Sequence, residues 1–352
     1  LYFQSKTIIL KLKSMIKLSV IPKALHFKQP AKTSRGVYIV RQIWLIKAED
    51  TESGKYGYGE CAPLPDLSCD ASEDYEKLLN EFCNETENDG AINYDKLRHY
   101  PSMLFGLETA LKDLNAESGR LWDTAFSRGE AGIPINGLIW MGNFDEMLVR
   151  IKEKMNLGFR CIKLKIGAID FEKEIELLSF IRKHFSADDV ELRVDANGAF
   201  SPSDAMEKLE RLSKLDLHSI EQPIRAGQWE EMARLTASTP LPIALDEELI
   251  GINDIEKKKK LLDIIKPQYI ILKPSLHGGI SGSEEWIDEA NKRNIPWWIT
   301  SALESNIGLN AIAQWCSSFN NPLPQGLGTG ALFTDNIPMP LEIRKDCLWR
   351  NV

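Results

Sequence analysis

The fold is decided by the stretch CIKLKIG (residues 161–167), a short apolar segment of strand type that carries two lysines where a buried strand should carry no charge. Five further segments of this kind follow along the chain. They are VELRVDANG (190–198), LHSIEQPI (217–224), LPIALDEE (241–248), YIILKPSL (269–276) and PWWITSALES (296–305). Burying a lone charge costs several kcal/mol, so such residues must pair or bind a ligand. We therefore expect them to meet at a functional site.

The six segments recur at a nearly constant interval. Successive polar residues are 30, 26, 25, 27 and 28 residues apart, counted through Lys165, Asp195, Glu221, Asp246, Lys273 and Ser301. This is about the length of one strand, one helix and their loops. Stretches such as FEKEIELLSFIRKHF (171–185) have the apolar spacing of a helix. An open doubly wound sheet would show the same alternation, but only a closed (β/α) barrel gathers functional groups from six successive strands at one rim.

The barrel pattern does not cover the whole chain. RGVYIVRQIWLIKAE (35–49) alternates like an antiparallel strand, helical segments follow, and IPINGLIW (133–140) is the first barrel strand expected. After about residue 320 the pattern gives way to a Pro- and Gly-rich segment. We divide the chain into a protease-site remnant (1–5), an α+β capping domain (6–130), the barrel (131–320) and a C-terminal segment that returns to the capping domain (321–352).

Composition excludes several classes of partner. The net charge is −8 and no basic stripe appears, which argues against nucleic acid; KKKK (257–260) is expected on a solvated helix face. No apolar run has the length of a membrane span, and no signal peptide is recognised. The six cysteines lack zinc-type clustering and fit the reducing cytoplasm. A small-molecule partner is expected, and homo-oligomerisation is left open.

Three acids indicate a metal site. Asp195, Glu221 and Asp246 stand at the ends of three successive predicted strands, so neighbouring strands place their carboxylates side by side. Oxygen ligands of this kind suit Mg²⁺, or Mn²⁺ in its place. The alternative is that each acid caps the next helix or pairs with an arginine. Glu247 and Glu248 compete with Asp246, but the alternation of the strand makes Asp246 the first residue that points inward.

Three lysines accompany the acids. Lys163 and Lys165 are two apart on one strand and face the same side, and Lys273 approaches from across the ring. Repulsion between neighbouring ammonium groups is expected to lower the pKa of at least one, which would provide a base near neutral pH. The alternative is that the lysines only neutralise the acids as structural ion pairs. A Schiff-base aldolase would need one such lysine, without the carboxylates.

These motifs resemble the enolase superfamily, and within it the muconate-lactonizing subgroup. The family of o-succinylbenzoate synthases is the most similar, over nearly the whole chain. The motifs that carry the resemblance are KLKIG, VDANGAF, IEQPI, LDEE, LKPSLHGG and SALESNIGLNAIAQW, with GYGECAPLP near the start and GLGTGALFTDN near the end. Dipeptide epimerases usually have an aspartate two residues after the sixth-strand lysine, whereas this chain has Ser275.

The resemblance implies a fold and a role for each residue. The fold would be the modified TIM barrel of the enolase superfamily, capped through the loops HFKQPAKTSRG (26–36) and CAPLPDLSCD (61–70), although a mobile surface loop explains either equally simply. Asp195, Glu221 and Asp246 would bind Mg²⁺. Lys165 would be the base, and Lys163 would hold the substrate carboxylate and lower the pKa of Lys165. Lys273 would cover the opposite face, as a cation–π partner or as the second acid/base of the pair. The substrate-binding or supporting residues would be Asn197, Ser301 (on the succinyl arm), Glu304 and Ser275.

The reaction implied is a dehydration. In it, 2-succinyl-6-hydroxy-2,4-cyclohexadiene-1-carboxylate loses water to give o-succinylbenzoate, an intermediate of menaquinone biosynthesis, through a metal-stabilised enediolate. Two alternatives within the superfamily are an N-acylamino acid racemase and a dipeptide epimerase. An alternative of another class is a non-catalytic barrel that keeps the metal as a structural ion.

Overall fold

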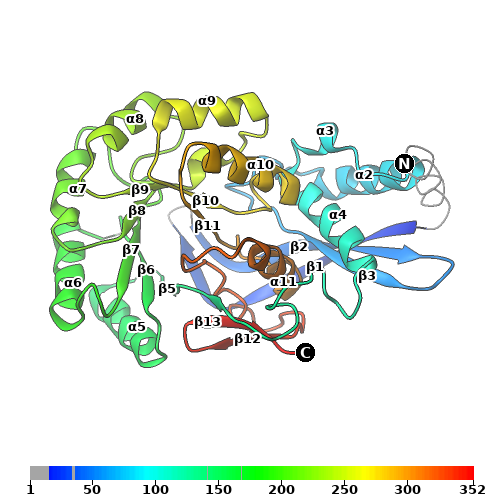
Figure 1. The fold of residues 1–352 in the computed structure, drawn as a ribbon, viewed down its shortest axis with the longest axis horizontal. Helices are drawn as coiled ribbons and strands as arrows, with labels where there is room; N and C mark the ends of the chain where they lie inside the picture. The colour runs from blue at the N-terminus through cyan, green and yellow to red at the C-terminus, as the bar shows by residue number, and fades with distance from the viewer. Residues whose placement is uncertain (1–15, 34–35, 141, 168) are drawn as a thin grey trace.

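The protein consists of a barrel and an α+β cap packed beside it (Figure 1). This computed structural model describes residues 16–33, 36–140, 142–167 and 169–352, so the protease-site remnant expected at 1–5 lies outside the described residues. The predicted fold class, an enolase-type barrel with an N-terminal α+β cap, is confirmed. No helix within the described ranges is long and apolar enough to cross a membrane.

The cap is an antiparallel sheet covered on one face by helices. Its strands are β1 (Ile16–Thr33), β2 (Gly36–Asp50) and β3 (Tyr56–Cys61), in that order, and its helices are α2 (Tyr75–Asp89), α3 (Tyr94–Leu97) and α4 (Pro101–Leu114). Helix α4 lies directly against β3 because glycines stand at the contact. A Cβ on Gly59 would come within 1.9 Å of the Gly106 carbonyl oxygen, so neither strand nor helix could approach so closely with a larger residue there.

Seven parallel strands make up most of the barrel. In spatial order they are β5 (Gly137–Ile139), β6 (Cys161–Lys165), β7 (Glu191–Asp195), β8 (Ser219–Glu221), β9 (Ile243–Leu245), β10 (Tyr269–Leu272) and β11 (Trp297–Ile299). Helices connect them around the outside, as Figure 1 shows. These are α5 (Phe144–Asn156), α6 (Phe171–His184), α7 (Ala205–Ser213), α8 (Trp229–Ser238), α9 (Ile255–Ile265) and α10 (Gly279–Lys292), with α11 (Asn306–Cys316) and η2 (Ser317–Phe319) after β11.

A segment outside the named strands closes the ring. Gln325 forms a parallel bridge with Ile135, and Gly326 forms one with Thr300 at the end of β11. These bridges connect the two edges of the seven-stranded sheet. The domain boundary expected at residue 320 would therefore separate this closing segment from the barrel that it completes.

The predicted first strand, IPINGLIW, is split between two sheets. Only β5 belongs to the barrel sheet, whereas β4 (Ile133–Pro134) pairs antiparallel with β13 (Cys347–Arg350), which forms a hairpin with β12 (Leu341–Arg344). The C-terminal hairpin thus joins the start of the barrel. The contact with the cap comes earlier, where Phe333 bridges Phe27 of β1.

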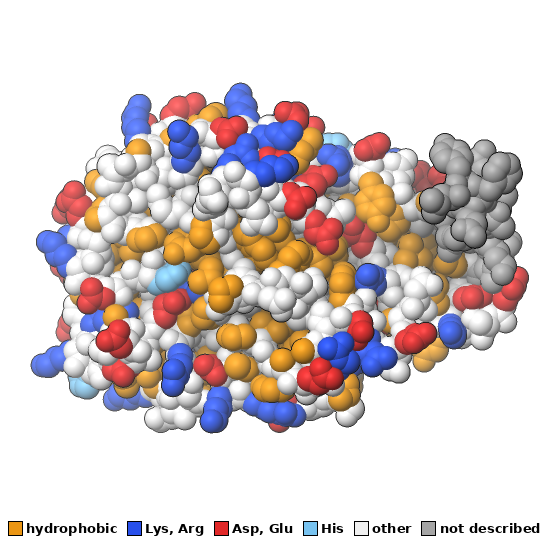
Figure 2. Space-filling view, viewed as in Figure 1, with side chains coloured by type: hydrophobic (Ala, Val, Ile, Leu, Met, Phe, Trp, Pro, Cys, Tyr) orange, Lys and Arg blue, Asp and Glu red, His pale blue; other side chains and the backbone are white. Residues whose placement is uncertain are grey.

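Charged side chains of both signs are mixed on the face of the molecule that Figure 2 shows. On the face in Figure 2, Lys and Arg side chains are interspersed with Asp and Glu around the rim, while apolar side chains gather toward the middle. The lysines of the KKKK run lie on α9, where Lys258 is fully buried and pairs with Glu285 at 2.8 Å. The expectation of a solvated face is therefore wrong for Lys258.

Candidate active site

The side chains predicted to carry the chemistry lie at the ends of neighbouring strands. In the register of β6, β7 and β8, Lys165 pairs with Asp195, and Asp195 pairs with Glu221. Asp246 directly follows β9. Because parallel strands end at the same rim, this register brings the side chains together. The three carboxylates are each at most 2% exposed.

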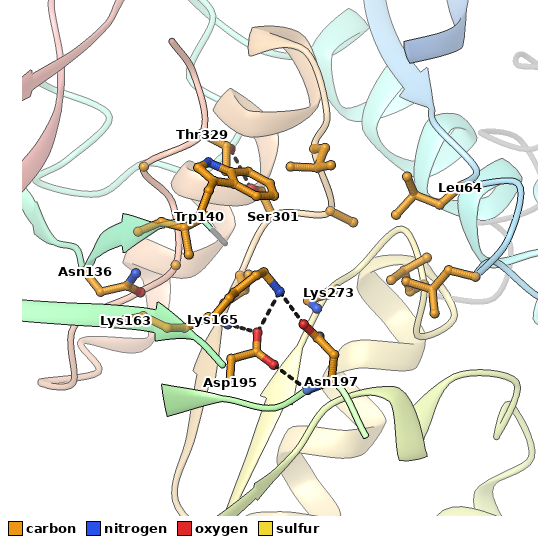
Figure 3. A pocket seen from close by; sticks show the side chains of 18 of the residues that line it. Leu64, Asn136, Trp140, Lys163, Lys165, Asp195, Asn197, Lys273, Ser301 and Thr329 are labelled. Carbon is orange, nitrogen blue, oxygen red and sulfur yellow. Dashed lines mark hydrogen bonds and ion pairs between the residues drawn. The ribbon is translucent and has the colours of Figure 1, made fainter. Parts of the chain in front are cut away.

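Two lysines from β6 bind these carboxylates. Lys163 Nζ lies 3.0 Å from Asp195 Oδ2 and 2.5 Å from Glu221 Oε2. Lys165 Nζ lies 2.9 Å from Asp195 Oδ2 and 2.8 Å from Asn197 Oδ1 (Figure 3). Both lysines therefore point into the barrel, as the alternation of β6 predicted.

The third lysine reaches the network from β10. The Lys273 ammonium forms an ion pair with Asp246. Asp246 makes no side-chain cap bond to the short helix η1 (Glu247–Leu249) that follows it, so the helix-capping alternative is wrong for this residue. Ammonium groups thus link the acids. In the described ranges no three His, Cys, Asp or Glu side chains lie close enough together to hold a metal ion as they stand.

Burial and charge compete in this network. Burial works against the charge of Asp195, but Lys163 and Lys165 outweigh it and lower the pKa of Asp195 well below its usual range. Burial, followed by the charge of Asp195, raises the pKa of Glu221 to about 8. For Lys163, burial favours the neutral form, yet the carboxylates of Asp195 and Glu221 outweigh it and raise its pKa. Lys163 is therefore not the lysine with the lowered pKa that the sequence led us to expect, because neighbouring carboxylates dominate over the second ammonium group.

Some of the acids keep oxygens without a partner. Glu221 Oε1, Asp246 Oδ1 and Glu247 Oε2 are buried and have no hydrogen-bond partner among the described residues. Glu248, in contrast, accepts hydrogen bonds from the Gln222 side chain and the Gly227 backbone. Unpartnered buried carboxylate oxygens are costly and indicate a ligand. Because every atom of this set that could bind a metal is an oxygen, the set fits a hard divalent cation such as Mg²⁺.

A pocket opens above the lysines, between the barrel and the cap. Figure 3 shows Lys165 and Lys273 at its floor, with Leu64 of the cap on the far side and Trp140 and Ser301 above. Its floor is charged and its walls are largely apolar. The lining residues are Tyr38, Leu64, Leu67, Asn136, Leu138, Trp140, Lys163, Lys165, Asp195, Asn197, Glu247, Lys273, Leu276, Thr300, Ser301, Ala302, Leu303, Gly326, Gly328 and Thr329.

The supporting residues predicted from sequence fall into two groups. Asn197 and Ser301 line the pocket; Asn197 Nδ2 donates to Glu247 Oε1 at 2.9 Å, and Ser301 Oγ lies 2.6 Å from Thr329 Oγ1. Ser275 and Glu304 do not line it. Ser275 Oγ donates to Glu304 Oε1 at 2.5 Å, and both residues are fully buried behind the wall.

Several lining residues were not predicted. Asn136 and Trp140 lie within IPINGLIW, whose polar and bulky residues gave the same signal as the later strands. Leu64 and Leu67 lie in the loop CAPLPDLSCD, which the sequence assigned to the lid without naming residues. Thr329 lies in the Gly-rich segment after the barrel closure, where no periodic pattern points to a site.

Comparison with known families gives matches over both parts of the chain. Residues 146–349 match the family described as Enolase C-terminal domain-like, and residues 35–114 match the family described as MenC, N-terminal domain. The o-succinylbenzoate synthase of Desulfotalea psychrophila is 45% identical over 94% of this chain and 98% of its own length. A protein with the same name from Geobacillus kaustophilus is 27% identical over 81% of this chain and 76% of its own.

Comparison with solved structures agrees with these family matches. The crystal structure of MenC from Desulfotalea psychrophila superposes with a TM-score of 0.82, at 42% identity, covering 96% of this chain and all of that one. Muconate lactonizing enzyme from Pseudomonas fluorescens, at 22% identity and a TM-score of 0.79, covers 96% of this chain and 94% of its own and shares the fold. The resemblance inferred from the sequence is thereby confirmed, and the chain belongs to the o-succinylbenzoate synthase family of the enolase superfamily.

Proposed function

We propose that this protein is a carbon–oxygen lyase that dehydrates 2-succinyl-6-hydroxy-2,4-cyclohexadiene-1-carboxylate to o-succinylbenzoate. The observation that carries the proposal is the pocket floor, where Lys165 and Lys273 from different strands face a buried group of carboxylates. This floor suits the removal of a proton next to a carboxylate. The name of the relatives gives the product, o-succinylbenzoate, and the cyclohexadiene acid is the substrate that the resemblance of the sequence implies.

Lys165 is the base in this proposal. In neutral form its Nζ takes the proton from the ring carbon that bears the carboxylate. The electron pair left behind forms the new ring double bond as the neighbouring C–O bond breaks. The same Nζ returns the proton to the departing hydroxide, so one water leaves and the ring becomes aromatic. Asn197, 2.8 Å from Nζ, orients the amine toward one face of the ring.

The other two lysines keep their charge. Lys163 is 7% exposed and its neighbouring carboxylates favour the ammonium form, so it contributes a fixed positive charge beside the substrate carboxylate. Lys273 stands across the pocket from Lys165. Burial disfavours its charge, but Asp246 and Glu221 outweigh burial and raise its pKa, so it covers the other ring face as a cation.

Asp195, Glu221 and Asp246 would hold Mg²⁺, or Mn²⁺ in its place. When bound, the metal ion would neutralise the negative charge that develops on the substrate carboxylate as the proton leaves. The buried, unpartnered oxygens of Glu221 and Asp246 support this assignment. The reaction would serve menaquinone biosynthesis, and the six free cysteines agree with a cytoplasmic enzyme.

The test is turnover of the cyclohexadiene acid by the purified protein, followed by loss of diene absorbance. We expect dehydration in Mg²⁺, loss of activity in excess chelator, and recovery when Mg²⁺ or Mn²⁺ is restored. Full activity in chelator would contradict the metal assignment. An N-acylamino acid is assayed in parallel, because two lysines on opposite faces also suit racemisation; racemisation without dehydration would replace the proposed function.

A further inference from the structure

A buried arginine joins the cap to the barrel at the pocket wall. Arg41, on β2 of the cap, is 2% exposed. Its Nη1 donates to the Pro63 carbonyl at 2.5 Å, and its Nη2 donates to the Ala62 carbonyl. Across the interface, Nη2 donates to the Ala302 carbonyl at 3.3 Å and Nε to the Leu303 carbonyl at 3.2 Å. One guanidinium thus holds two loops that are about 240 residues apart in the sequence.

Both loops carry the apolar wall of the pocket. Leu64, directly after Pro63, lines the pocket from the cap side, and Ala302 and Leu303 line it from the barrel side. Leu64 and Ala302 pack together with Leu276 in one buried cluster, against which Leu303 also packs. This wall faces the lysines at the floor, so its position sets the height of the pocket.

The barrel loop is held in a conformation that its sequence disfavours. Leu303 has a φ of +64°, in the left-handed region that a leucine rarely adopts. Such a backbone persists only where the surrounding structure fixes it, and such residues gather at functional sites. The hydrogen bond from Arg41 Nε to the carbonyl of Leu303 is a direct constraint on this residue.

Keeping Arg41 charged in this place is itself costly. Burial disfavours the guanidinium charge, and the nearest compensating charges are Glu304 and Glu60. Arg41 forms no salt bridge within 4.0 Å in the described part of the chain, so backbone carbonyls are its direct partners. An apolar residue could fill the same volume more cheaply if packing were the only requirement.

We propose that Arg41 is a positioning residue for substrate specificity, which fixes Leu64 and Leu303 as the wall that holds the carbocyclic ring of the substrate above Lys165. The proposal rests on the proposed function, since it assigns part of that pocket to part of that substrate. The wall contacts the ring in the bound state and in the transition state alike. Losing it therefore weakens binding and leaves the chemical step largely intact.

The first experiment replaces Arg41→Lys, which keeps the charge but loses the planar fork of donors. We expect KM for the cyclohexadiene acid, and the dissociation constant of o-succinylbenzoate measured by calorimetry, to rise about tenfold, with kcat changed by no more than about threefold. Arg350→Lys is the matched control. Arg350 is also buried and donates to carbonyls, those of Ser127, Ser118 and Gly119, away from the pocket. It should lose thermal stability with KM unchanged.

The second experiment tests whether Arg41 acts through Leu303. Leu303→Gly removes the side chain that forms the wall, so it should raise KM about tenfold by itself. Glycine also adopts the left-handed backbone without strain, so the variant should fold. In that background Arg41→Lys should raise KM by clearly less than tenfold, about threefold at most, because only the Leu64 side of the wall is left for Arg41 to position. Multiplicative effects, or an Arg41→Lys protein with wild-type KM, would overturn the proposal. If Arg41→Lys does not fold, an unchanged KM in Leu303→Gly would overturn the proposal by itself. A wild-type protein without dehydratase activity would instead reject the proposed function.

Discussion

Lys163 and Lys165 differ in their surroundings although they lie two residues apart on β6. Lys163 contacts two carboxylates and is almost completely buried. Lys165 contacts one carboxylate and the neutral Asn197, and its side chain is more exposed, at 13% against 9%. The less anionic and more open position suits a group that must give up and take back a proton. We therefore propose Lys165 as the group that carries the chemistry and Lys163 as a fixed charge.

A pair of lysine variants separates a one-base from a two-base mechanism. Lys165→Ala should abolish dehydration, with a loss of about 10⁴-fold or more, because one amine removes the proton and returns it. Lys273→Arg keeps the positive charge but cannot act as a base near neutral pH, so it should retain a measurable fraction of the activity. The measurement is the rate of loss of diene absorbance in both variants, at saturating substrate.

Racemisation of an N-acylamino acid gives the control. That reaction needs a base on each face of the substrate, so Lys273→Arg should eliminate any racemase activity of the protein. Near wild-type dehydration by Lys165→Ala would remove Lys165 from the mechanism. Equal inactivity of Lys273→Arg in dehydration would make Lys273 an acid–base partner and end the one-base account.

The residues at the floor could be predicted, whereas those of the wall could not. Alternation on a strand determines that Lys163 and Lys165 share a side, and the common rim of parallel strands brings Asp195 and Glu221 beside them. No comparable rule exists for Arg41. Its partners are backbone carbonyls, which every residue has, so the sequence carries no sign of which loops it joins.

At the scale of elements, carboxylates of the cap cover helix ends of the barrel. Glu60, at the end of β3, accepts hydrogen bonds from the backbone N–H of Ser305 at 2.7 Å and of Gly308 at 2.8 Å, in the first turn of α11. Glu108 of α4 accepts from the backbone N–H of Ile280 at 2.6 Å, in the first turn of α10. Each bond satisfies a helix N–H that has no partner within its own helix.

The buried carboxylate of Glu60 should make stability depend on pH. Burial raises its pKa to about 7 in the folded protein, against an ordinary value of 4.5. Between these values the folded state binds a proton that the unfolded state has lost. The contribution of Glu60 to stability therefore falls as pH rises from about 4.5 to about 7, by about 3 kcal/mol at most, and is constant above that range.

Glu60→Gln tests this sign, because glutamine cannot ionise. The free energy of unfolding of the wild type minus that of the variant should fall as pH rises through this window, measured by urea unfolding at four pH values. Asp254→Asn is the control, since Asp254 caps α9 in an exposed position through the N–H groups of Glu256 and Lys257. A difference that stays constant with pH would show that Glu60 is ionised throughout.

The pattern of elements shows where sequence periodicity stops being informative. The strands β6 to β11 follow from a regular repeat, and each was placed correctly. The prediction of a single strand over IPINGLIW is wrong because β4 has only two residues and pairs with β13, more than 200 residues away. The closing bridges of Gln325 and Gly326 are single pairs, too short for any alternation to show.

At the scale of the whole molecule, polar contacts tie the cap to the barrel on several sides. Arg41 joins them at the pocket wall, Glu60 joins them at the start of α11, and Glu108 joins them at α10. Arg98 of the cap reaches Glu285 of α10 at 3.0 Å. Many of these groups are buried, so separating the two parts would expose or orphan them at considerable cost.

We predict from these contacts that cap and barrel unfold together. Proteins with more than one domain commonly unfold in steps, so a single transition is a discriminating result. Calorimetric and van't Hoff enthalpies should agree, and far- and near-ultraviolet circular dichroism should change at the same temperature.

Phe333→Ala, which removes a buried ring packed on Phe27 of the cap, should lower that temperature for both signals at once, by an amount equivalent to about 3–5 kcal/mol. Ile343→Ala is the matched control, because Ile343 is 38% exposed on the C-terminal hairpin and should leave the transition nearly unchanged. Two resolved transitions in the wild type, or a shift of only one signal in Phe333→Ala, would mean that the cap can melt while the barrel, with its carboxylates and lysines, stays folded.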